Sequence, residues 1–267
     1  MSLPARLYKY ESFSAQSIEN LKNQVLYFNS PLRFNDPYDC AVFPSIAEPN
    51  DAEVEEIRAH YLAIDGLEPK VRVAFERTSI PGLRIMLLRM GQDVLDQQLQ
   101  EFVSKRGISC FAERPDNLLM WSHYAEQHKG FCLEFRTDLD PFTKARQVKY
   151  TNSMPQFSLT RMLCDRDFDE VMDLYCCKAR DWQYEREWRC IHNEGGTAYT
   201  YKTEALVGVY MGSQSSFTAL EIIALILAGQ NTQVQLWQGS RNKSEFAVEF
   251  LPTSYTPHLE AKRRGLL

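Results

Sequence analysis

The chain has 267 residues, of which 44% are hydrophobic and 24% are charged, and its formal net charge at pH 7 is −5. This composition is typical of a globular protein and excludes long disordered or fibrous structure. The negative charge argues against a broad basic surface for nucleic acid, although a local basic patch stays open. The first ten residues hold no apolar run of signal-peptide length, and the apolar stretch Ile222–Ala228 is too short to span a bilayer. We therefore expect a cytoplasmic protein with no membrane role.

The cysteines predict reduced thiols. Seven of them are scattered along the chain, with no CxxC pair and no Cys/His cluster at zinc-ligand spacing. An odd number of cysteines without an export signal favours thiols over disulfides, and structural zinc is not expected. Cys132 follows His123 and His128, as a nucleophile would, but its place in an alternating strand favours a small buried hydrophobic residue.

The first forty residues predict a strand, a helix and a second strand. Leu7 to Tyr10 and Val25 to Phe28 have the composition of short strands, and Ser14 is a suitable N-cap for a helix that ends near Lys22. Turn residues follow at 29–31 and 35–37. The opening of the chain is therefore βαβ-like or hairpin-like.

Residues 51–106 show helical spacing of apolar residues, in two runs that start near Val54 and Leu83. Pro69 and the pair Pro81-Gly82 interrupt the pattern, so two helices are the simplest account. The segment carries no evident chemistry. We expect it to be a helical insertion or a lid.

The rest of the chain predicts most of the sheet. A strand is expected at 108–112, a helix at 118–128 and an alternating strand at 131–136. Further strands are expected near 147–150, 187–192, 206–211, 233–237 and 246–251, with helices around 167–178 and 217–228. We predict a single α+β domain over residues 1–267, with a mixed, mostly antiparallel sheet, surrounding helices and the helical insertion at about 51–106.

The first candidate cluster combines Lys9 and Tyr10 with Asn35, Asp36 and Asp39 in the long turn. Lys9 would supply a cation for phosphate or carboxylate, and the aspartates would accept hydrogen bonds from a ribose or orient a base. The alternative is an Asx turn whose polar side chains satisfy their own backbone.

The second cluster lies on the predicted helix at 118–128. Trp121, Tyr124, Ala125 and His128 share one face by their three- and four-residue spacing. This stripe would stack on a flat ring and donate hydrogen bonds from Tyr124 and His128. A plain amphipathic helix with its aromatic residues in the core has the same pattern.

The third cluster is the segment 182–189. If the chain is extended here, Glu185, Glu187 and Arg189 share one face, and Arg186 and Trp188 share the other. Two carboxylates and a guanidinium beside aromatic residues form either a site or a salt-bridge ladder. The common nucleotide and hydrolase motifs are absent from the sequence.

Several motifs together resemble a known family. They are LYKY, LYFNSPLRFNDPYD, CFAE followed by NLLMWSHYAEQHKGFCLEF, WQYEREWR and VYMG. By these motifs the chain is similar to the bacterial domain-of-unknown-function family 2971, from Leu7 to about Tyr255. The family label implies no reaction.

A more distant resemblance is to the ADP-ribosyltransferase superfamily, in which an early strand supplies His or Arg, a middle segment Tyr or Ser, and a late strand Glu. Lys9 with Tyr10, then Tyr124, then Glu185-x-Glu187 follow that order, and Lys9 stands where the superfamily has His or Arg. The resemblance implies a split sheet and NAD as the bound cofactor.

The resemblance also implies roles. Glu187 would bind the nicotinamide ribose and stabilise the oxocarbenium-like transition state, and Glu185 would orient an acceptor or water. Trp121 and Tyr124 would pack a ring of NAD. Lys9, Arg186 or Arg189 would neutralise the diphosphate. The implied function is an NAD-dependent ADP-ribosyltransferase or NAD glycohydrolase-like enzyme, with a small-molecule nucleotide as partner and a protein or nucleic acid as candidate acceptor.

Two alternatives stay open. A metal-dependent nuclease or phosphodiesterase would use carboxylates as Mg²⁺ ligands; the candidates are Asp36, Asp39, Glu134 and Glu187. A non-catalytic nucleotide-binding or sensor module would use the same aromatic pocket without converting its ligand.

Overall fold

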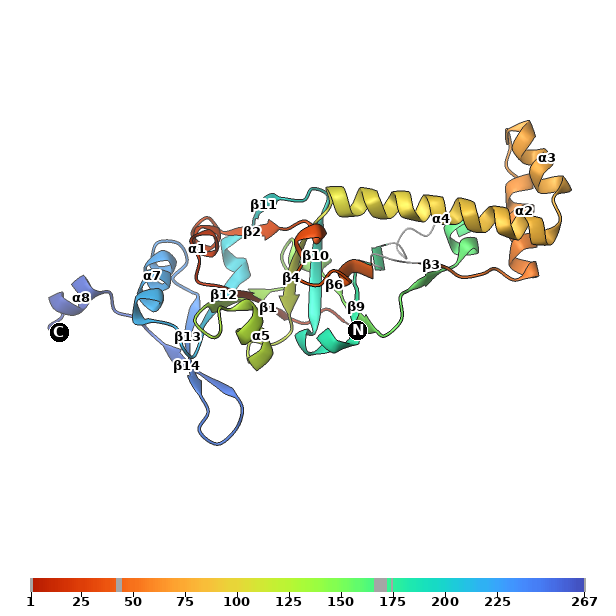
Figure 1. Cartoon of the computed structure of the whole chain (residues 1–267). Helices are drawn as coiled ribbons and strands as arrows, with labels where there is room; N and C mark the ends of the chain where they lie inside the picture. The colour runs from red at the N-terminus through yellow and green to blue at the C-terminus, as the bar shows by residue number, and fades with distance from the viewer. Residues whose placement is uncertain (1, 42–44, 166–171, 174, 267) are drawn as a thin grey trace. The chain divides into compact units, whose positions relative to one another are not determined.

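The computed structural model describes residues 2–41, 45–165, 172–173 and 175–266. The chain forms two compact units, and Figure 1 labels most of the helices and strands of the chain. Unit 1 contains Met1–Ser30, Gly107–Val148 and Asp181–Leu267, and unit 2 contains Pro31–Arg106 and Lys149–Arg180. The predicted helical insertion at 51–106 lies in unit 2, and the single domain over the whole chain stays a prediction.

Unit 1 is built around an eight-stranded sheet. In spatial order the strands are β14 (Val248–Thr253), β13 (Gln235–Arg241), β12 (Leu206–Met211), β5 (Phe131–Arg136), β1 (Arg6–Glu11), β4 (Gly107–Ala112), β10 (Glu187–His192) and β6 (Arg146–Gln147). Neighbouring strands are antiparallel except β12 and β13, which are joined through helix α7 (Phe217–Ala228), because a parallel pair needs a crossover. The predicted α+β fold with a mixed, mostly antiparallel sheet is confirmed.

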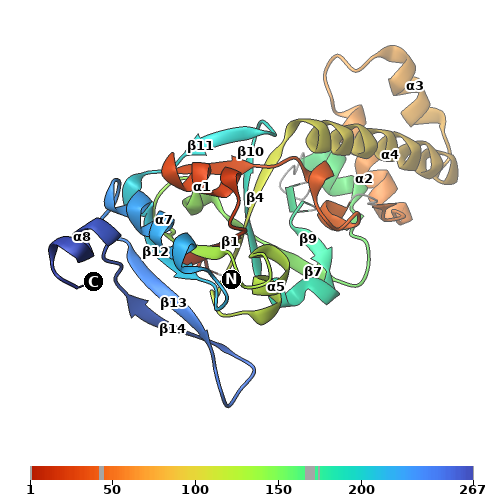
Figure 2. The same ribbon diagram turned by 60° about the vertical axis from the view of Figure 1, so that its left-hand side comes forward.

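One face of this sheet carries the larger apolar core. Leu7 of β1 and Phe131 and Phe135 of β5 are fully buried there, because alternate residues of a strand point to the same face. Helix α1 (Ala15–Lys22) and α7 contact each other, as Figure 2 shows, and add Leu21 and Ile223 to the same core. A separate pair, β2 (Val25–Phe28) and β11 (Thr197–Thr200), completes the strands of unit 1.

A second, aromatic core includes Tyr10 of β1, Cys132 of β5 and Tyr210 of β12, with Met120 and Trp121 of helix α5 (Leu118–Tyr124) packed among them. Cys132 is fully buried, and this burial raises the pKa of its thiol well above the usual range. The prediction that Cys132 is a small buried hydrophobic residue is confirmed. The candidate site lies beside this second core.

Unit 2 is mainly helical. Its helices are α2 (Asp51–Leu62), α3 (Pro69–Arg77) and α4 (Ile80–Lys105), and its strands form the parallel pairs β3 (Ser45–Ile46) with β8 (Gln156–Phe157) and β7 (Lys149–Thr151) with β9 (Cys177–Ala179). The prediction of two helices over 51–106 is therefore wrong. Pro69 is the first residue of α3 and Pro81 the second of α4, where the missing backbone N–H costs no hydrogen bond, so each proline marks the start of a separate helix.

The remaining described elements are short. They are the 3-10 turns η1 (Pro31–Arg33), η2 (Asp39–Ala41), η3 (Phe142–Lys144), η5 (Arg180–Glu185) and η6 (Thr203–Ala205), the π-turn η4 (Arg161–Asp165) and the helix α8 (His258–Arg263). Half of the helix predicted at 167–178 falls outside the described residues, and Cys177–Ala179 at its end is a strand. All seven cysteines are free thiols. Within the described ranges, no helix combines the length and apolarity that crossing a bilayer requires.

Candidate functional site

Glu185 and Tyr124 form a hydrogen-bonded pair in unit 1. The hydroxyl of Tyr124, the last residue of α5, donates to Oε1 of Glu185 over 2.6 Å. Glu185 ends η5 and is only 3% exposed. A hydrogen bond that a carboxylate accepts in a nearly water-free place is short and strong, so it fixes the orientation of the carboxylate. Two of the three residues predicted as catalytic are therefore in direct contact.

The backbone turns between Glu185 and Glu187. Arg186 has a φ of +44°, a left-handed conformation that is sparsely populated by residues other than glycine. Glu185 therefore lies before the strand, and β10 begins at Glu187. The predicted extended run that would place both glutamates on one strand face is wrong.

Glu187 and Arg189 do lie on one face of β10, and they form a buried ion pair. Nε and Nη2 of Arg189 donate to the two carboxylate oxygens of Glu187 over 2.7 and 3.0 Å. Arg189 is 0% and Glu187 4% exposed. Two parallel hydrogen bonds of this kind match the guanidinium to the carboxylate. The pair has the geometry of a structural salt bridge, which the sequence left open as the alternative to a functional site.

A cavity of about 410 Å³ borders Glu185, within the size range of ligand sites. Its polar lining includes Arg114, Asn117 and Arg186, and its apolar lining includes Leu118 and Phe246. The Asn117 side chain accepts from two backbone N–H groups at the start of α5 and donates to the Tyr184 carbonyl over 2.8 Å. One asparagine thus ties α5 to η5 and holds the cavity wall in place.

Trp121 and Tyr10 lie in the aromatic core, which shares Met120 with the lining of this cavity. Trp121 is 0% exposed, and its indole N–H donates to the Pro115 carbonyl over 2.6 Å. The two rings meet edge to face with centroids 5.2 Å apart, and the Tyr10 hydroxyl donates to the Arg114 carbonyl over 2.8 Å. Burial raises the pKa of Tyr10 above its usual range. Both rings are buried in this core, and neither of them lines the cavity.

Helix α5 ends four residues earlier than predicted, at Tyr124. Glu126, Gln127 and His128 follow with φ values of +49°, +55° and +70°, so the chain makes a left-handed turn before entering β5. The turn is held by the Gln214 N–H, which donates to the His128 carbonyl over 3.0 Å, and by the Gly212 N–H, which donates to the Gly130 carbonyl over 3.0 Å. The predicted helical stripe therefore does not extend to His128.

Gly212→Ala is expected to destabilise unit 1 by about 1–3 kcal/mol, because an added Cβ would overlap the carbonyl of His128 and force the packed backbone apart. Urea denaturation measures this difference. Gly229→Ala is the matched control, since the φ of Gly229 is −84° and no atom lies closer than 3.5 Å to its added Cβ. Equal stability of the two variants would contradict the role given to Gly212.

The first predicted cluster is divided between the two units. Nζ of Lys9 donates to the Cys110 carbonyl over 3.4 Å, pairs with Glu11 at 3.6 Å and lies over the Phe111 ring. In unit 2, the Asp36 carboxylate accepts from the Tyr38 N–H over 2.9 Å, as in an Asx turn, and Asn35 is exposed. These contacts agree with the structural alternative for this cluster.

Three of the four carboxylates proposed as Mg²⁺ ligands, Asp39, Glu134 and Glu187, are paired with cations. Asp39 lies 3.3 Å from Lys178, and Glu134 lies 3.3 Å from Arg6. Glu134 also accepts a hydrogen bond of 3.0 Å from the Tyr210 hydroxyl. Across the described ranges, no group of three or more His, Cys, Asp or Glu side chains is arranged to hold a metal ion. No observation favours the metal-dependent nuclease.

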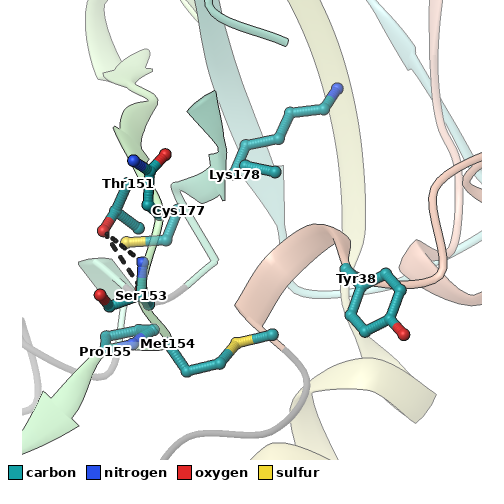
Figure 3. A pocket seen from close by; sticks show the side chains of 9 residues that line it. Tyr38, Thr151, Ser153, Met154, Pro155, Cys177 and Lys178 are labelled. Carbon is teal, nitrogen blue, oxygen red and sulfur yellow. Dashed lines mark hydrogen bonds between the residues drawn. The ribbon is translucent and has the colours of Figure 1, made fainter. Parts of the chain in front are cut away.

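Unit 2 contains a smaller cavity of about 170 Å³, shown in Figure 3. Thr151, Ser153 and Cys177 line one side of it. The Thr151 hydroxyl exchanges hydrogen bonds with the backbone of Ser153, and the Lys178 ammonium pairs with Asp39. The Thr151 hydroxyl and the Lys178 ammonium are thus already engaged, and this cavity does not stand out as a ligand site.

Sequence reasoning missed Asn117 and Phe246, which line the main cavity, and Arg241, which lines a cavity that shares Phe246 with it. Asn117 precedes an apolar run in the manner of an N-cap, and this signal was available. Arg241 and Phe246 belong to the loop end of the β13–β14 hairpin, whose position beside α5 depends on the order of the strands. No local sequence pattern predicts the order of the strands in the sheet.

Comparison with known proteins gives one family match. No curated protein and no solved structure matches the chain. No comparison supports the distant resemblance to the ADP-ribosyltransferase superfamily, so NAD chemistry stays a proposal. Residues 120–190, which include Tyr124, Glu185, Glu187 and Arg189, match the model of a family described as a protein of unknown function (DUF2971).

Proposed function

We propose that the protein cleaves the bond between nicotinamide and ribose in NAD, transferring ADP-ribose to water or to an acceptor. The proposal is carried by one observation: Glu185 is a nearly buried carboxylate, oriented by Tyr124, at the wall of a cavity of ligand size. A carboxylate held in this way is suited to stabilise positive charge that develops in a transition state.

The residue order of the distant resemblance favours Glu187 for this role, but the contacts favour Glu185. Glu187 is neutralised by two hydrogen bonds from Arg189, and Glu185 lines the cavity. A fixed guanidinium beside Glu187 would oppose an adjacent oxocarbenium ion. We therefore assign transition-state stabilisation to Glu185 and a structural role to the pair of Glu187 with Arg189.

The reaction is balanced without a further cofactor. The C1′–N bond breaks and its electron pair leaves with nicotinamide, which becomes neutral. The ribose carbon takes on oxocarbenium character beside the Glu185 carboxylate. Water or an acceptor nucleophile then adds to C1′ and loses a proton to solvent. Arg186, which also lines the cavity, is available to neutralise phosphate charge.

The test is nicotinamide release from NAD by the purified protein, alone and with cell lysate, compared with Glu185→Gln. Release by the wild type and loss in the variant supports the proposal. If NAD binds and is recovered unchanged, the protein is a sensor and the proposal fails. Release that needs lysate, with ADP-ribose found on a macromolecule, identifies a transferase.

Tyr124→Phe is expected to lower kcat for NAD cleavage about tenfold with little change in KM, because the lost hydrogen bond orients the catalytic carboxylate. The fold should be retained, since only one hydroxyl is removed. Steady-state nicotinamide release measures the effect, with Tyr199→Phe on β11 as the control. An unchanged kcat would show that Glu185 needs no help from Tyr124.

A further inference from the structure

A second cavity, of about 220 Å³, lies beside the first in unit 1, and the two share Leu118 and Phe246 as lining residues. Its polar lining includes His128 from the left-handed turn, Ser213 from the segment after β12 and Arg241 from the end of β13. Three segments that are far apart in the sequence thus place hydrogen-bonding side chains around one space.

The backbone around this cavity is held firmly. The His128 N–H donates to the Trp121 carbonyl over 3.1 Å, and the His128 carbonyl accepts from Gln214. On the opposite side, the Asn242 side chain accepts from the backbone N–H groups of Ser244 and Glu245 over 2.7 and 2.8 Å. The side chains of the cavity therefore project from fixed positions, which favours ligand binding because little ordering is needed.

In the described part of the chain, the side chains of His128 and Ser213 make only long hydrogen bonds. Nδ1 of His128 lies 3.5 Å from the Ser213 hydroxyl, and Nε2 lies 3.4 Å from the Ser122 hydroxyl. Both distances exceed those of good hydrogen bonds to nitrogen. Within the described residues, no carboxylate forms an ion pair with Arg241. The cavity therefore has donors that a ligand can engage without breaking strong contacts.

The donor groups of the site fit an anion, although the charge of Glu245 in the lining offsets that of Arg241. Burial, and then the positive charge of Arg241, lower the pKa of His128, so the imidazole is neutral at neutral pH and still carries one N–H donor. A guanidinium with hydroxyl and imidazole donors matches the oxygens of a phosphate group. Glu245 also lines the cavity, at its hairpin side.

We infer that this second cavity binds a phosphate group of a nucleotide, with Arg241, Ser213 and His128 as its donors. Because the cavity shares Leu118 and Phe246 with the one that Glu185 lines, one nucleotide could place its ribose in the first cavity and its phosphate in the second. The inference that a single nucleotide occupies both cavities rests on the proposed function. The inference that the second cavity binds phosphate is independent of the proposed function.

Isothermal titration with ADP and with adenosine tests the inference. The wild type is expected to bind ADP more tightly than adenosine. Arg241→Gln should weaken ADP binding about 10- to 100-fold and leave adenosine unaffected, because a charge-assisted hydrogen bond is lost. Lys243→Gln is the matched control, as Lys243 lies on the same hairpin, is exposed and does not line the cavity. Ser213→Ala should weaken ADP binding about threefold, and thermal unfolding checks that each variant is folded.

Equal weakening by Arg241→Gln and Lys243→Gln would overturn the inference, since it would indicate general attraction to a basic surface. Equal affinity of the wild type for ADP and adenosine would also overturn it. Phosphate-selective binding without nicotinamide release would support this site and refute NAD cleavage. Nicotinamide release that depends on Glu185, with ADP binding unchanged by Arg241→Gln, would support NAD cleavage and refute the phosphate site.

Discussion

Glu185→Gln is expected to lower the rate of nicotinamide release from NAD by about 10²- to 10³-fold, the loss that follows removal of one preorganised electrostatic group from an active site. Glutamine has the shape of glutamate and can still accept the hydrogen bond from Tyr124, so the fold and the cavity are retained. What is lost is the negative charge beside the developing oxocarbenium ion. Single-turnover kinetics with quantified nicotinamide measure the effect.

The control for this variant is Glu194→Gln, which removes the same charge from an exposed position after β10. Its activity should equal that of the wild type. If Glu185→Gln remains as active as Glu194→Gln, the carboxylate at the cavity wall is not catalytic. If NAD affinity falls while kcat is unchanged, Glu185 binds substrate in the ground state only.

Arg189→Met is expected to lower the free energy of unfolding by about 3–5 kcal/mol, because it removes the two hydrogen bonds and the positive charge that Arg189 provides to the buried Glu187 carboxylate. A loss of this size is a large share of the stability of an ordinary domain. Urea denaturation followed by far-UV circular dichroism measures it, provided that the transition is two-state.

The double variant Arg189→Met with Glu187→Leu separates two explanations. Apolar replacement of both partners should restore much of the stability, since the unpaired charge is gone. Cys110 gives a second readout: the Glu187 charge adds to burial in raising the pKa of its thiol, so reaction of Cys110 with a thiol reagent should respond to the loss of Glu187. A double variant as unstable as the single one would mean that packing of Arg189, and not charge pairing, dominates.

Much of the sheet is predictable from the sequence because its strands carry local patterns. The segment 131–136 alternates, and its strand, like those at 187–192 and 206–211, has the predicted bounds in the structure. The apolar helix at 217–228 is likewise correct, with Ser216 as its N-cap. In these segments the local preference and the tertiary packing agree.

The site is less predictable because tertiary contacts determine it. The end of α5 depends on two glycines from different parts of the chain. Gly130 lies close to the Ala125 carbonyl and Gly212 close to the His128 carbonyl, both in the turn that follows α5. The separation of Glu185 from Glu187 depends on the left-handed φ of Arg186, an unusual choice for arginine. Such strained conformations occur where the surrounding structure enforces them. Local propensity therefore predicts an extended chain here and places Glu185 wrongly on the same strand face as Glu187.

The outermost strand of the sheet, β14, bears on how this protein behaves at high concentration. Its residue Pro252, opposite Trp237, has no backbone N–H, and Glu249 places a charge on the same strand. Proline and charged side chains on an edge strand discourage pairing with the edge of another molecule. At the other end of the sheet, β6 has only two residues. Neither edge is a good template for adding strands, which protects the protein against growth into cross-β aggregates.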